Sequence, residues 1–350
     1  MICYTLVRFF WYLSMLLNAQ DRQSIDTIKG ILIFLVVFGH MLESNLTNEH
    51  FKYIYSLIYT FHMPIFIFIS GFLSKASKDV NIGKLTKGVI LPLILFNVIY
   101  EAVNFLKNGS LSGYFYIAAP YWLMWYLLSL FFWKLIAPFI LSTRHPLVSA
   151  IAISLLCQYL DFNGMSFSAM RTFTFLPFYI MGCLAFKHSL HTKKIPMRIS
   201  LITLIVSFAC LALLSQNAPI PFLYGSSGFS SLGLTNIHFL GYKALSYFGV
   251  ISLIASLFYL RPSLSFLSRL GGYSLSIYLI HGLFIRELSL FLLKNTTQDL
   301  LLAVQIVACI IVCYLLSFKM INEFLKVLFD KTFSLFSNDD TQEKHSFKTR

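Results

Sequence analysis

Four ionisable side chains lie inside long apolar stretches of the sequence: His40, His62, Glu101 and His281. Such groups are costly in an apolar interior, so a functional role is the first hypothesis for each of them. A buried imidazole is disfavoured in its charged form, and the neutral ring can take a proton from a hydroxyl group. A lone histidine in a helical bundle is more often an interhelical hydrogen-bond contact, and this alternative stays open for His281. The four residues therefore indicate proton-transfer chemistry inside an apolar domain.

A lysine precedes the first of these histidines in the same apolar segment. Lys29 and His40 are eleven residues apart, which is about three helical turns and about 16 Å of rise, so they lie on broadly the same helix face. Asp26 and Lys29 are expected at the cytoplasmic start of this helix, where Asp26 could be an N-cap and Lys29 could extend toward the membrane surface. The next segment runs back through the membrane, so His62 could share the depth of His40.

The elements that carry these residues must be membrane-spanning helices. Charged residues make up 12% and hydrophobic residues 57% of the 350 residues, and Phe alone occurs 36 times, which excludes a water-soluble protein. The apolar runs are long enough for spanning helices and lack the alternation of an outer-membrane barrel. We predict an all-α, polytopic integral membrane protein with about ten transmembrane helices, at approximately 25–43, 51–73, 88–106, 122–141, 147–160, 172–187, 199–214, 239–260, 272–293 and 300–318.

The formal net charge is +13, which in a soluble protein would suggest a nucleic-acid or acidic partner. The connections after the even-numbered predicted helices hold Lys75, Lys78, Lys84, Lys87, Arg144, Lys187, Lys193, Lys194, Arg198, Arg261 and Arg269. The other connections hold only Lys52, Lys107, Arg171, Lys243 and Lys294. Because Lys and Arg collect in cytoplasmic loops, this asymmetry predicts that both termini are cytoplasmic. The charge is explained by topology, and no nucleic-acid partner is expected.

The chain divides into three parts by composition. Residues 1–20 are predicted to be an apolar extension, either an interfacial helix or a mis-assigned start, without a removable signal peptide. Residues 21–335 are expected to form one membrane domain, and residues 336–350 a polar cytoplasmic tail. The uncharged stretch 215–238 is expected on the outer face, as a simple linker or as a lid over a site. The six cysteines lack paired spacing and predict neither a disulfide nor a metal site.

Five separated blocks carry a family resemblance. The first, Ser24–Leu42, has a basic residue, ten intervening positions and a histidine, here Lys29 and His40; the second, Tyr59–Leu73, has FHMP followed by Ser-Gly. The remaining blocks are Trp122–Trp133, Arg171–Leu184 and Leu270–Phe284. In this order, from residue 21 to about 320, they resemble the membrane-bound acyltransferase family 3, with its fucose 4-O-acetylase-like branch the most similar.

The resemblance implies an O-acyltransferase of the cytoplasmic (inner) membrane of a bacterium. It implies acetyl-CoA as the acyl donor and co-substrate, with no metal. The acceptor would be a hydroxyl group of a surface carbohydrate: O-antigen, capsule, exopolysaccharide or a cell-wall sugar. His40 would deprotonate this hydroxyl or be transiently acylated itself, and His62, Glu101 and His281 would orient His40 or polarise the thioester.

The donor carries several phosphates, which predicts a cationic site at the cytoplasmic entrance. Lys29, Lys84 and Lys87 are the candidate residues, because they are expected on that side of the membrane. The family often has an Arg-x-x-Arg pair before the third helix, whereas this sequence has Lys84-x-x-Lys87. Lysine keeps the charge for phosphate but loses the bidentate geometry of arginine.

Two other functions are alternatives to acyl transfer. A proton-coupled transporter or exporter of a glycan or glycan precursor would use the histidines and Glu101 as a proton relay, but no internal repeat is visible. A glycosyltransferase with a polyprenyl-linked donor usually needs an acidic residue in the first outer loop, where Glu43 and Glu49 lie. Those two glutamates are interpreted as ordinary solvated loop residues, so an acyltransferase is favoured over a glycosyltransferase.

Overall fold

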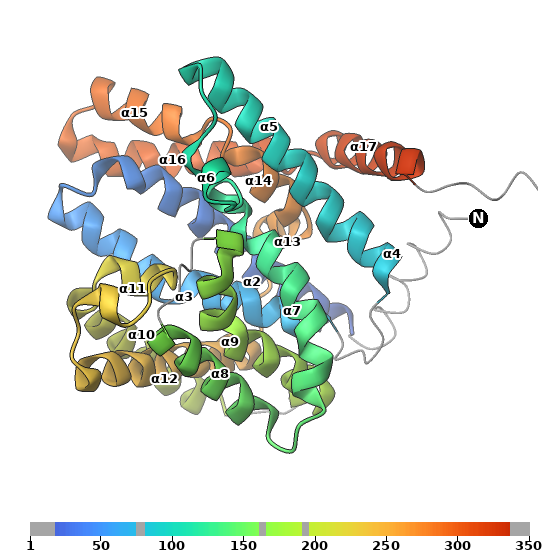
Figure 1. Cartoon of the computed structure of the whole chain (residues 1–350). Coiled ribbons are helices and arrows are strands. Elements are labelled where there is room, and N and C mark those ends of the chain that lie inside the picture. Colours follow the sequence, from blue (N-terminus) through green and yellow to red (C-terminus); the bar gives the residue numbers. More distant parts are fainter. Residues whose placement is uncertain (1–17, 75–80, 161–165, 191–195, 337–350) are drawn as a thin grey trace, which may run out of the picture.

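Figure 1 shows a computed structural model of the chain, which describes residues 18–74, 81–160, 166–190 and 196–336. Within these residues the regular elements are helices, and no strand is present. The α-helices are α2 (Ala19–Leu42), α3 (Glu49–Leu73), α4 (Ile82–Leu85), α5 (Leu91–Asn108), α6 (Gly113–Tyr116), α7 (Trp125–Leu141), α8 (Pro146–Leu160), α9 (Ala169–Lys187), α10 (Met197–Asn217), α11 (Ile220–Tyr224), α12 (Asn236–Leu260), α13 (Ser265–Gly272), α14 (Ser274–His281), α15 (Ile285–Asn295), α16 (Gln298–Leu316) and α17 (Lys319–Phe336). The predicted all-α architecture is confirmed.

Eight helical segments of the described chain are long and apolar enough to cross a membrane. They are Ala19–Asn45, Glu49–Leu73, Ile82–Asn108, Trp122–Leu141, Ser166–Lys187, Met197–Asn217, Asn236–Leu260 and Gln298–Leu316. The bent pair of α14 and α15 makes a ninth span if its two parts are counted together, and α8 is a shorter apolar helix. Every one of the ten predicted segments thus contains a helix, and the chain is a polytopic membrane protein. The side on which each terminus lies stays a prediction.

Two predicted spans differ in the structure. The segment 272–293 is not a single helix, because α14 and α15 meet at an angle of 66°. Gly282 lies at this break, and a Cβ atom there would overlap the side chains of Leu123 and Tyr100. The break is therefore packed tightly against other elements. α8 has 15 residues, which gives a rise of about 22 Å, less than the ~30 Å of a hydrocarbon core.

α2 begins earlier than predicted. The side chain of Asn18 accepts a hydrogen bond from the Asp21 backbone N–H at 2.7 Å, which is the usual arrangement of an N-cap. Asp26 is therefore not the N-cap; its carboxylate pairs with Lys29 at 3.0 Å. Because the helix starts at Ala19, Lys29 lies about 15 Å along it and not at its start.

α2 is the helix around which the others are arranged. It contacts α3, α13, α14, α15 and α16, and Ile33, Val37 and Met41 on it are fully buried. The backbones of α2 and α13 approach closely at Gly30, where a Cβ atom would overlap the Leu267 carbonyl. Small residues allow this kind of approach between membrane helices, where packing and not hydrophobic collapse drives association.

α3 and α9 pack in the same way. A Cβ atom on Gly71 would overlap the backbone carbonyl of Tyr179, and one on Gly182 would overlap that of Phe68. The thiol of Cys183 donates to the Gly71 carbonyl at 3.3 Å. The Ser-Gly pair of the second sequence block is thus explained by close helix packing.

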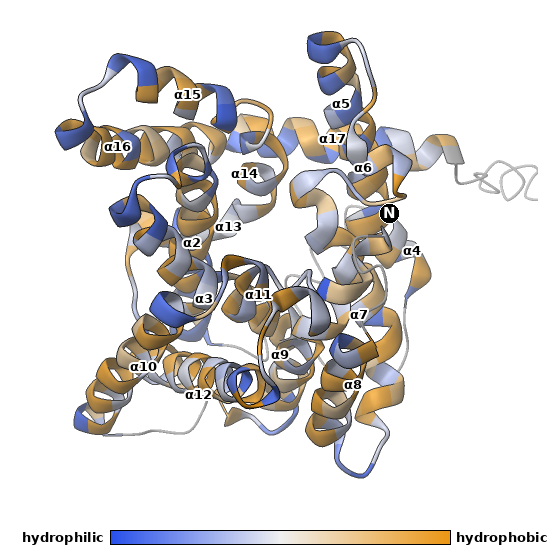
Figure 2. Cartoon of the chain, turned by 60° about the vertical axis from the view of Figure 1, so that its left-hand side comes forward, coloured by the Kyte–Doolittle hydropathy of each residue, from blue (hydrophilic) through white to orange (hydrophobic). Residues whose placement is uncertain are grey.

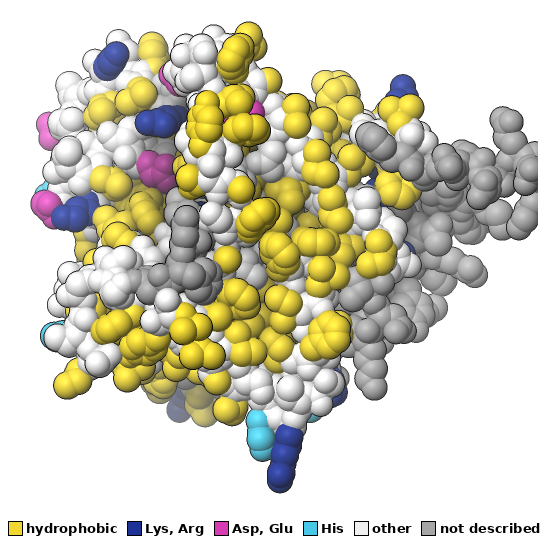
Figure 3. All heavy atoms as spheres, viewed as in Figure 1, with side chains coloured by type: hydrophobic (Ala, Val, Ile, Leu, Met, Phe, Trp, Pro, Cys, Tyr) yellow, Lys and Arg dark blue, Asp and Glu magenta, His cyan; other side chains and the backbone are white. Residues whose placement is uncertain are grey.

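The outer surface of the bundle is apolar. Figure 2 shows hydrophobic segments along α8, α10, α12 and α16, and Figure 3 shows hydrophobic side chains over much of the face drawn. Exposed large residues include Ile205 on α10, Phe248 on α12 and Val307 on α16. A surface of this kind on several helices is expected to face lipid.

Several predictions fall outside the described residues. They concern residues 1–17 of the N-terminal extension, most of the tail 336–350, and Lys75, Lys78, Lys193 and Lys194. The division of the chain into these parts therefore stays a prediction.

We expect Gly71→Ala to destabilise the protein by about 1–3 kcal/mol or more, because the added methyl group overpacks a backbone contact. Gly241→Ala on α12 is the matched control, because nothing lies within 4 Å of a Cβ atom at that position. Thermal unfolding of the detergent-purified variants measures the difference. An unchanged Tm for Gly71→Ala would contradict the close packing of α3 and α9.

Candidate active site

The candidate site lies where α2 ends and the chain turns into α3. His40 is in the last turn of α2, and its Nδ1 atom is 2.9 Å from Oε1 of Glu43, three residues later. The side chains of His40 and Glu43 are 14% and 29% exposed. Both groups are therefore held by the bundle and still reachable by a substrate.

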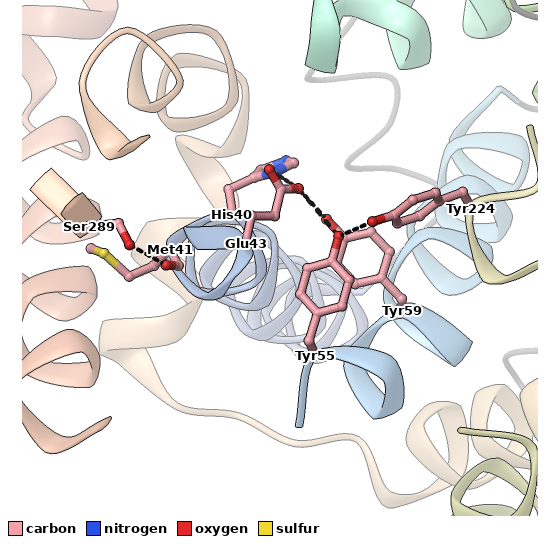
Figure 4. A network of polar contacts seen from close by, with 7 residues as sticks. All are labelled: His40, Met41, Glu43, Tyr55, Tyr59, Tyr224 and Ser289. Atoms are coloured by element: carbon pink, nitrogen blue, oxygen red, sulfur yellow. Dashed lines mark hydrogen bonds and ion pairs between the residues drawn. The ribbon is translucent and has the colours of Figure 1, made fainter. Parts of the chain in front are cut away.

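Three tyrosines surround the Glu43 carboxylate (Figure 4). Tyr59 donates to Oε1 of Glu43 at 3.0 Å and Tyr55 donates to the same atom at 3.4 Å. The two tyrosines are four residues apart on α3, so they share one face of that helix. Tyr224, the last residue of α11, lies 2.8 Å from the Tyr55 hydroxyl. Burial raises the pKa of the Tyr224 phenol, so its hydroxyl stays protonated.

The break after α14 brings His281 beside His40. The two rings are stacked with their centroids 5.5 Å apart, and the Trp122 ring lies edge-on at 4.6 Å from His40. His281 is fully buried, and its Nδ1 lies 2.8 Å from the Ile277 carbonyl. Its Nε2 is buried without a hydrogen-bond partner. The structure thus places His281, one of the candidate residues, in ring contact with His40.

His62 reaches the same site through Tyr59. Its ring lies edge-on to Tyr59 at 4.7 Å, and its Nδ1 is 2.7 Å from the Ile58 carbonyl. The side chain is buried, with 3% exposure, so it does not present itself to a substrate as His40 does.

The hydrogen bonds fix the tautomers of these histidines. A carbonyl oxygen only accepts, so Nδ1 carries the proton in His62 and His281, and the carboxylate of Glu43 favours the same tautomer in His40. In the neutral form each ring then has its free electron pair on Nε2. Among the three, only His40 combines this arrangement with a carboxylate partner and exposure.

Glu101 is engaged elsewhere. Its carboxylate accepts hydrogen bonds from the backbone N–H of Ser112, at 3.0 Å, and from the Ser112 hydroxyl. Nearby, Asn97 of the same helix accepts from the Tyr121 N–H at 2.7 Å. These two contacts hold the two ends of the segment 112–121, which leads to Trp122. Within the described residues no hydrogen bond or ion pair joins Glu101 to His40, so the structure does not bring it into the cluster.

The three candidate donor lysines have different surroundings. Lys29 pairs with Asp26 at 3.0 Å, and Lys87 pairs at 2.5 Å with Asp330 of α17. Lys84 lies exposed on α4. Lys29 and Lys87 thus each already face a carboxylate. Among the described residues no group of three or more His, Cys, Asp or Glu could hold a metal ion.

The sequence interpretation missed Glu43, which it treated as a solvated loop residue. Its spacing of three residues from His40 was a usable signal, because i and i+3 share a helix face. Arg171 was also missed as a site residue. Its guanidinium lies 5.0 Å from the Trp125 ring centroid and within electrostatic reach of Tyr59 and Tyr224.

One family model and two curated proteins match this chain. Residues 22–319 match the family model described as an acyltransferase domain. The chain is 32% identical over 159 residues to the nodulation protein NolL of Sinorhizobium fredii, covering 40% of this chain and 43% of that protein. It is 30% identical over 192 residues to NolL of Mesorhizobium japonicum, covering 48% of each chain. The match thus spans less than half the length of these curated relatives.

No solved structure gives a significant match. The family model, however, covers the chain from the start of α2 to the start of α17, and so includes every residue of the His40 cluster. The chain therefore belongs to acyltransferase family 3, and it is a polytopic membrane protein.

Proposed function

We propose that the protein is an O-acyltransferase that moves an acetyl group from cytoplasmic acetyl-CoA to a hydroxyl group of a cell-surface carbohydrate. The observation that carries the proposal is the pairing of the exposed His40 with Glu43, which is itself held by Tyr55 and Tyr59. A histidine oriented by a carboxylate is the arrangement that general-base catalysis requires.

In the proposed reaction, Nε2 of His40 accepts the proton of the acceptor hydroxyl. The hydroxyl oxygen forms a bond to the thioester carbonyl carbon, and a tetrahedral oxyanion results. When this intermediate collapses, the carbon–sulfur bond breaks and the CoA sulfur takes the proton back from His40. Glu43 keeps the imidazole in the required tautomer and stabilises its protonated form.

The oxyanion needs a positive or hydrogen-bonding group near the reacting carbon. Arg171 fits this role by its charge, because Tyr59 and Tyr224 lie within its electrostatic reach. Its Nε atom is buried without a hydrogen-bond partner. His281 and His62 are buried, and we assign them to positioning His40 and Tyr59.

The donor is proposed to bind with its phosphates near Lys29, Lys84 and Lys87. Lys87 supports this role because its ammonium group already pairs with an oxyanion. Its Nζ atom lies 2.5 Å from Oδ1 of Asp330, and a phosphate oxygen could replace this carboxylate oxygen. A phosphate of CoA would compete with that carboxylate for the same ammonium group.

The acceptor is proposed to be a surface glycan of a bacterium, with the enzyme in its cytoplasmic membrane. Membership of the acyltransferase family supports a transferase over the proton-coupled transporter and over the polyprenyl-dependent glycosyltransferase. The matched relatives are named nodulation proteins and come from Sinorhizobium and Mesorhizobium, which supports a bacterial origin.

His40→Ala is expected to lower acetyl transfer about 10²–10⁴-fold, the usual contribution of a general base. Glu43→Gln is expected to lower acetyl transfer by a large part of the same factor, because it removes the charge that orients His40. Glu49→Gln is the control, since Glu49 lies nearby with 81% exposure and pairs only with Lys52 among the described residues. Label transfer from [¹⁴C]acetyl-CoA to the host glycan measures all three. Normal transfer by His40→Ala would contradict the mechanism.

The two residues that hold the segment before Trp122 can be tested as a pair. If Glu101 acts only through Ser112, then Glu101→Gln and Ser112→Ala lower activity by similar factors, and the double variant loses no more than either one. Initial rates of transfer give this comparison. An inactive Glu101→Gln beside a normal Ser112→Ala would instead assign a chemical role to Glu101.

Lys87→Ala is expected to raise the KM for acetyl-CoA several-fold with little change in kcat, because it removes a phosphate partner. Asp330→Asn should lower the same KM, since it removes the competing carboxylate. Lys107→Ala is the matched control, because Lys107 is also paired, at 3.0 Å with Glu287, but lies in the last turn of α5. Steady-state kinetics in proteoliposomes distinguish the variants. An unchanged KM in both Lys87→Ala and Asp330→Asn would place the donor elsewhere.

A further inference from the structure

A second apolar cluster beside the candidate active site contains a buried lysine. Its core residues are Leu214, Ala218, Phe222, Leu223 and Phe239, from α10, α11, α12 and the connection between α10 and α11. Lys243 of α12 lies against this cluster with only 7% of its surface exposed. The proposed mechanism does not use it.

Lys243 has aromatic neighbours but no counter-ion. Its Nζ atom lies 4.6 Å from the ring centroid of Phe222 and 5.5 Å from that of Phe239. Within the described residues, Nζ of Lys243 has no hydrogen-bond or ion-pair partner. Cation–π attraction to two rings offsets only part of the cost of burying an ammonium group, so an anionic partner would be strongly favoured.

The lysine borders a cavity of about 20 Å³. Such a volume is enough for a group the size of one water molecule or one oxygen atom, but not for a sugar ring. Thr174 also lines the cavity, and its hydroxyl is buried without a hydrogen-bond partner. The cavity thus offers one cation and one unused hydroxyl group to a small oxyanion.

The cavity adjoins the reaction site through two elements. Tyr59 lines it and also donates to Glu43 at 3.0 Å. Phe222 and Leu223 of α11 line it as well, and the next residue, Tyr224, lies 2.8 Å from the Tyr55 hydroxyl. An anionic group held at Lys243 would therefore place the rest of its molecule close to Tyr59 and, beyond it, to His40.

We propose that Lys243 and Thr174 form an anion-binding subsite that holds one oxygen atom of a carboxylate or phosphate group of the acceptor. The assignment of that molecule as the acceptor rests on the proposed function, whereas binding of an anion at Lys243 does not. In this arrangement α11, within the stretch 215–238, covers the anionic end of the bound molecule. The acceptor class is thereby narrowed to charged carbohydrates, either acidic sugars or sugars carried on a phosphate-linked lipid.

Binding to the detergent-purified full chain tests the subsite without any need for catalysis. D-glucuronate and dihexanoyl phosphatidic acid are the two probes, and D-glucose is the neutral control. We expect one of the anions to raise the Tm in a concentration-dependent manner, and Lys243→Met to weaken this effect at least tenfold. The more effective anion identifies the source of the charge, a sugar carboxylate or a lipid phosphate. The same substitution at Lys294, an exposed residue of α15, should leave the binding unchanged.

Thr174→Val provides a second variant in case Lys243→Met does not fold, and it should weaken the binding of the same anion several-fold. Equal stabilisation of wild type and both variants, or none by either anion, would overturn the subsite. Acetyl transfer to the host glycan is measured in parallel. Loss of both anion binding and transfer in Lys243→Met is expected if the bound anion belongs to the acceptor, and normal transfer with lost anion binding would contradict that assignment. Absence of transfer by the wild type would count against the proposed function alone.

Discussion

The arrangement of the candidate site depends on one carboxylate. Glu43 lies at the end of α2 with 29% of its side chain exposed, in a region where charge is scarce. Three donors converge on a single oxygen of this group, from His40, Tyr55 and Tyr59. A charge placed among apolar helices needs such partners, and in return it fixes their positions relative to one another. The orientation of His40 therefore follows from the need to satisfy Glu43.

Close backbone packing gives this carboxylate its fixed surroundings. Gly30 brings α2 against α13, and Gly71 brings α3 against α9. The two helices that supply His40 and Tyr59 are thus each held by a neighbour at backbone distance, where small shifts are not tolerated. Because the outer surface of the bundle is largely apolar, hydrophobic burial does not determine which helices pair, and these close backbone contacts do so instead.

Much of this fold could be predicted from hydropathy, because a bilayer imposes the length of each span. The histidines of α2 and α14 could be singled out because the apolar stretches around them, residues 30–42 and 274–281, contain no other charged side chain. The spacing of Glu43 from His40 could suggest their contact, but the inward direction of the Glu43 side chain depends on the short 3-10 turn that follows α2. The bend after His281 and the contact of Glu101 with Ser112 depend on tertiary packing, which a single sequence does not contain.

The length of α2 constrains how donor and acceptor can meet. Lys29 and His40 are eleven residues apart on one helix, so the distance between them along its axis is about 16 Å, roughly half of a hydrocarbon core. His40 lies near the end of that helix, beside the outer connection predicted between α2 and α3. A donor whose phosphates stay near Lys29 needs only its extended thioester arm to reach His40, and the acceptor need not enter deeply. Under the proposed function, neither polar molecule has to cross the whole bilayer, because the two reacting groups would meet at one end of α2.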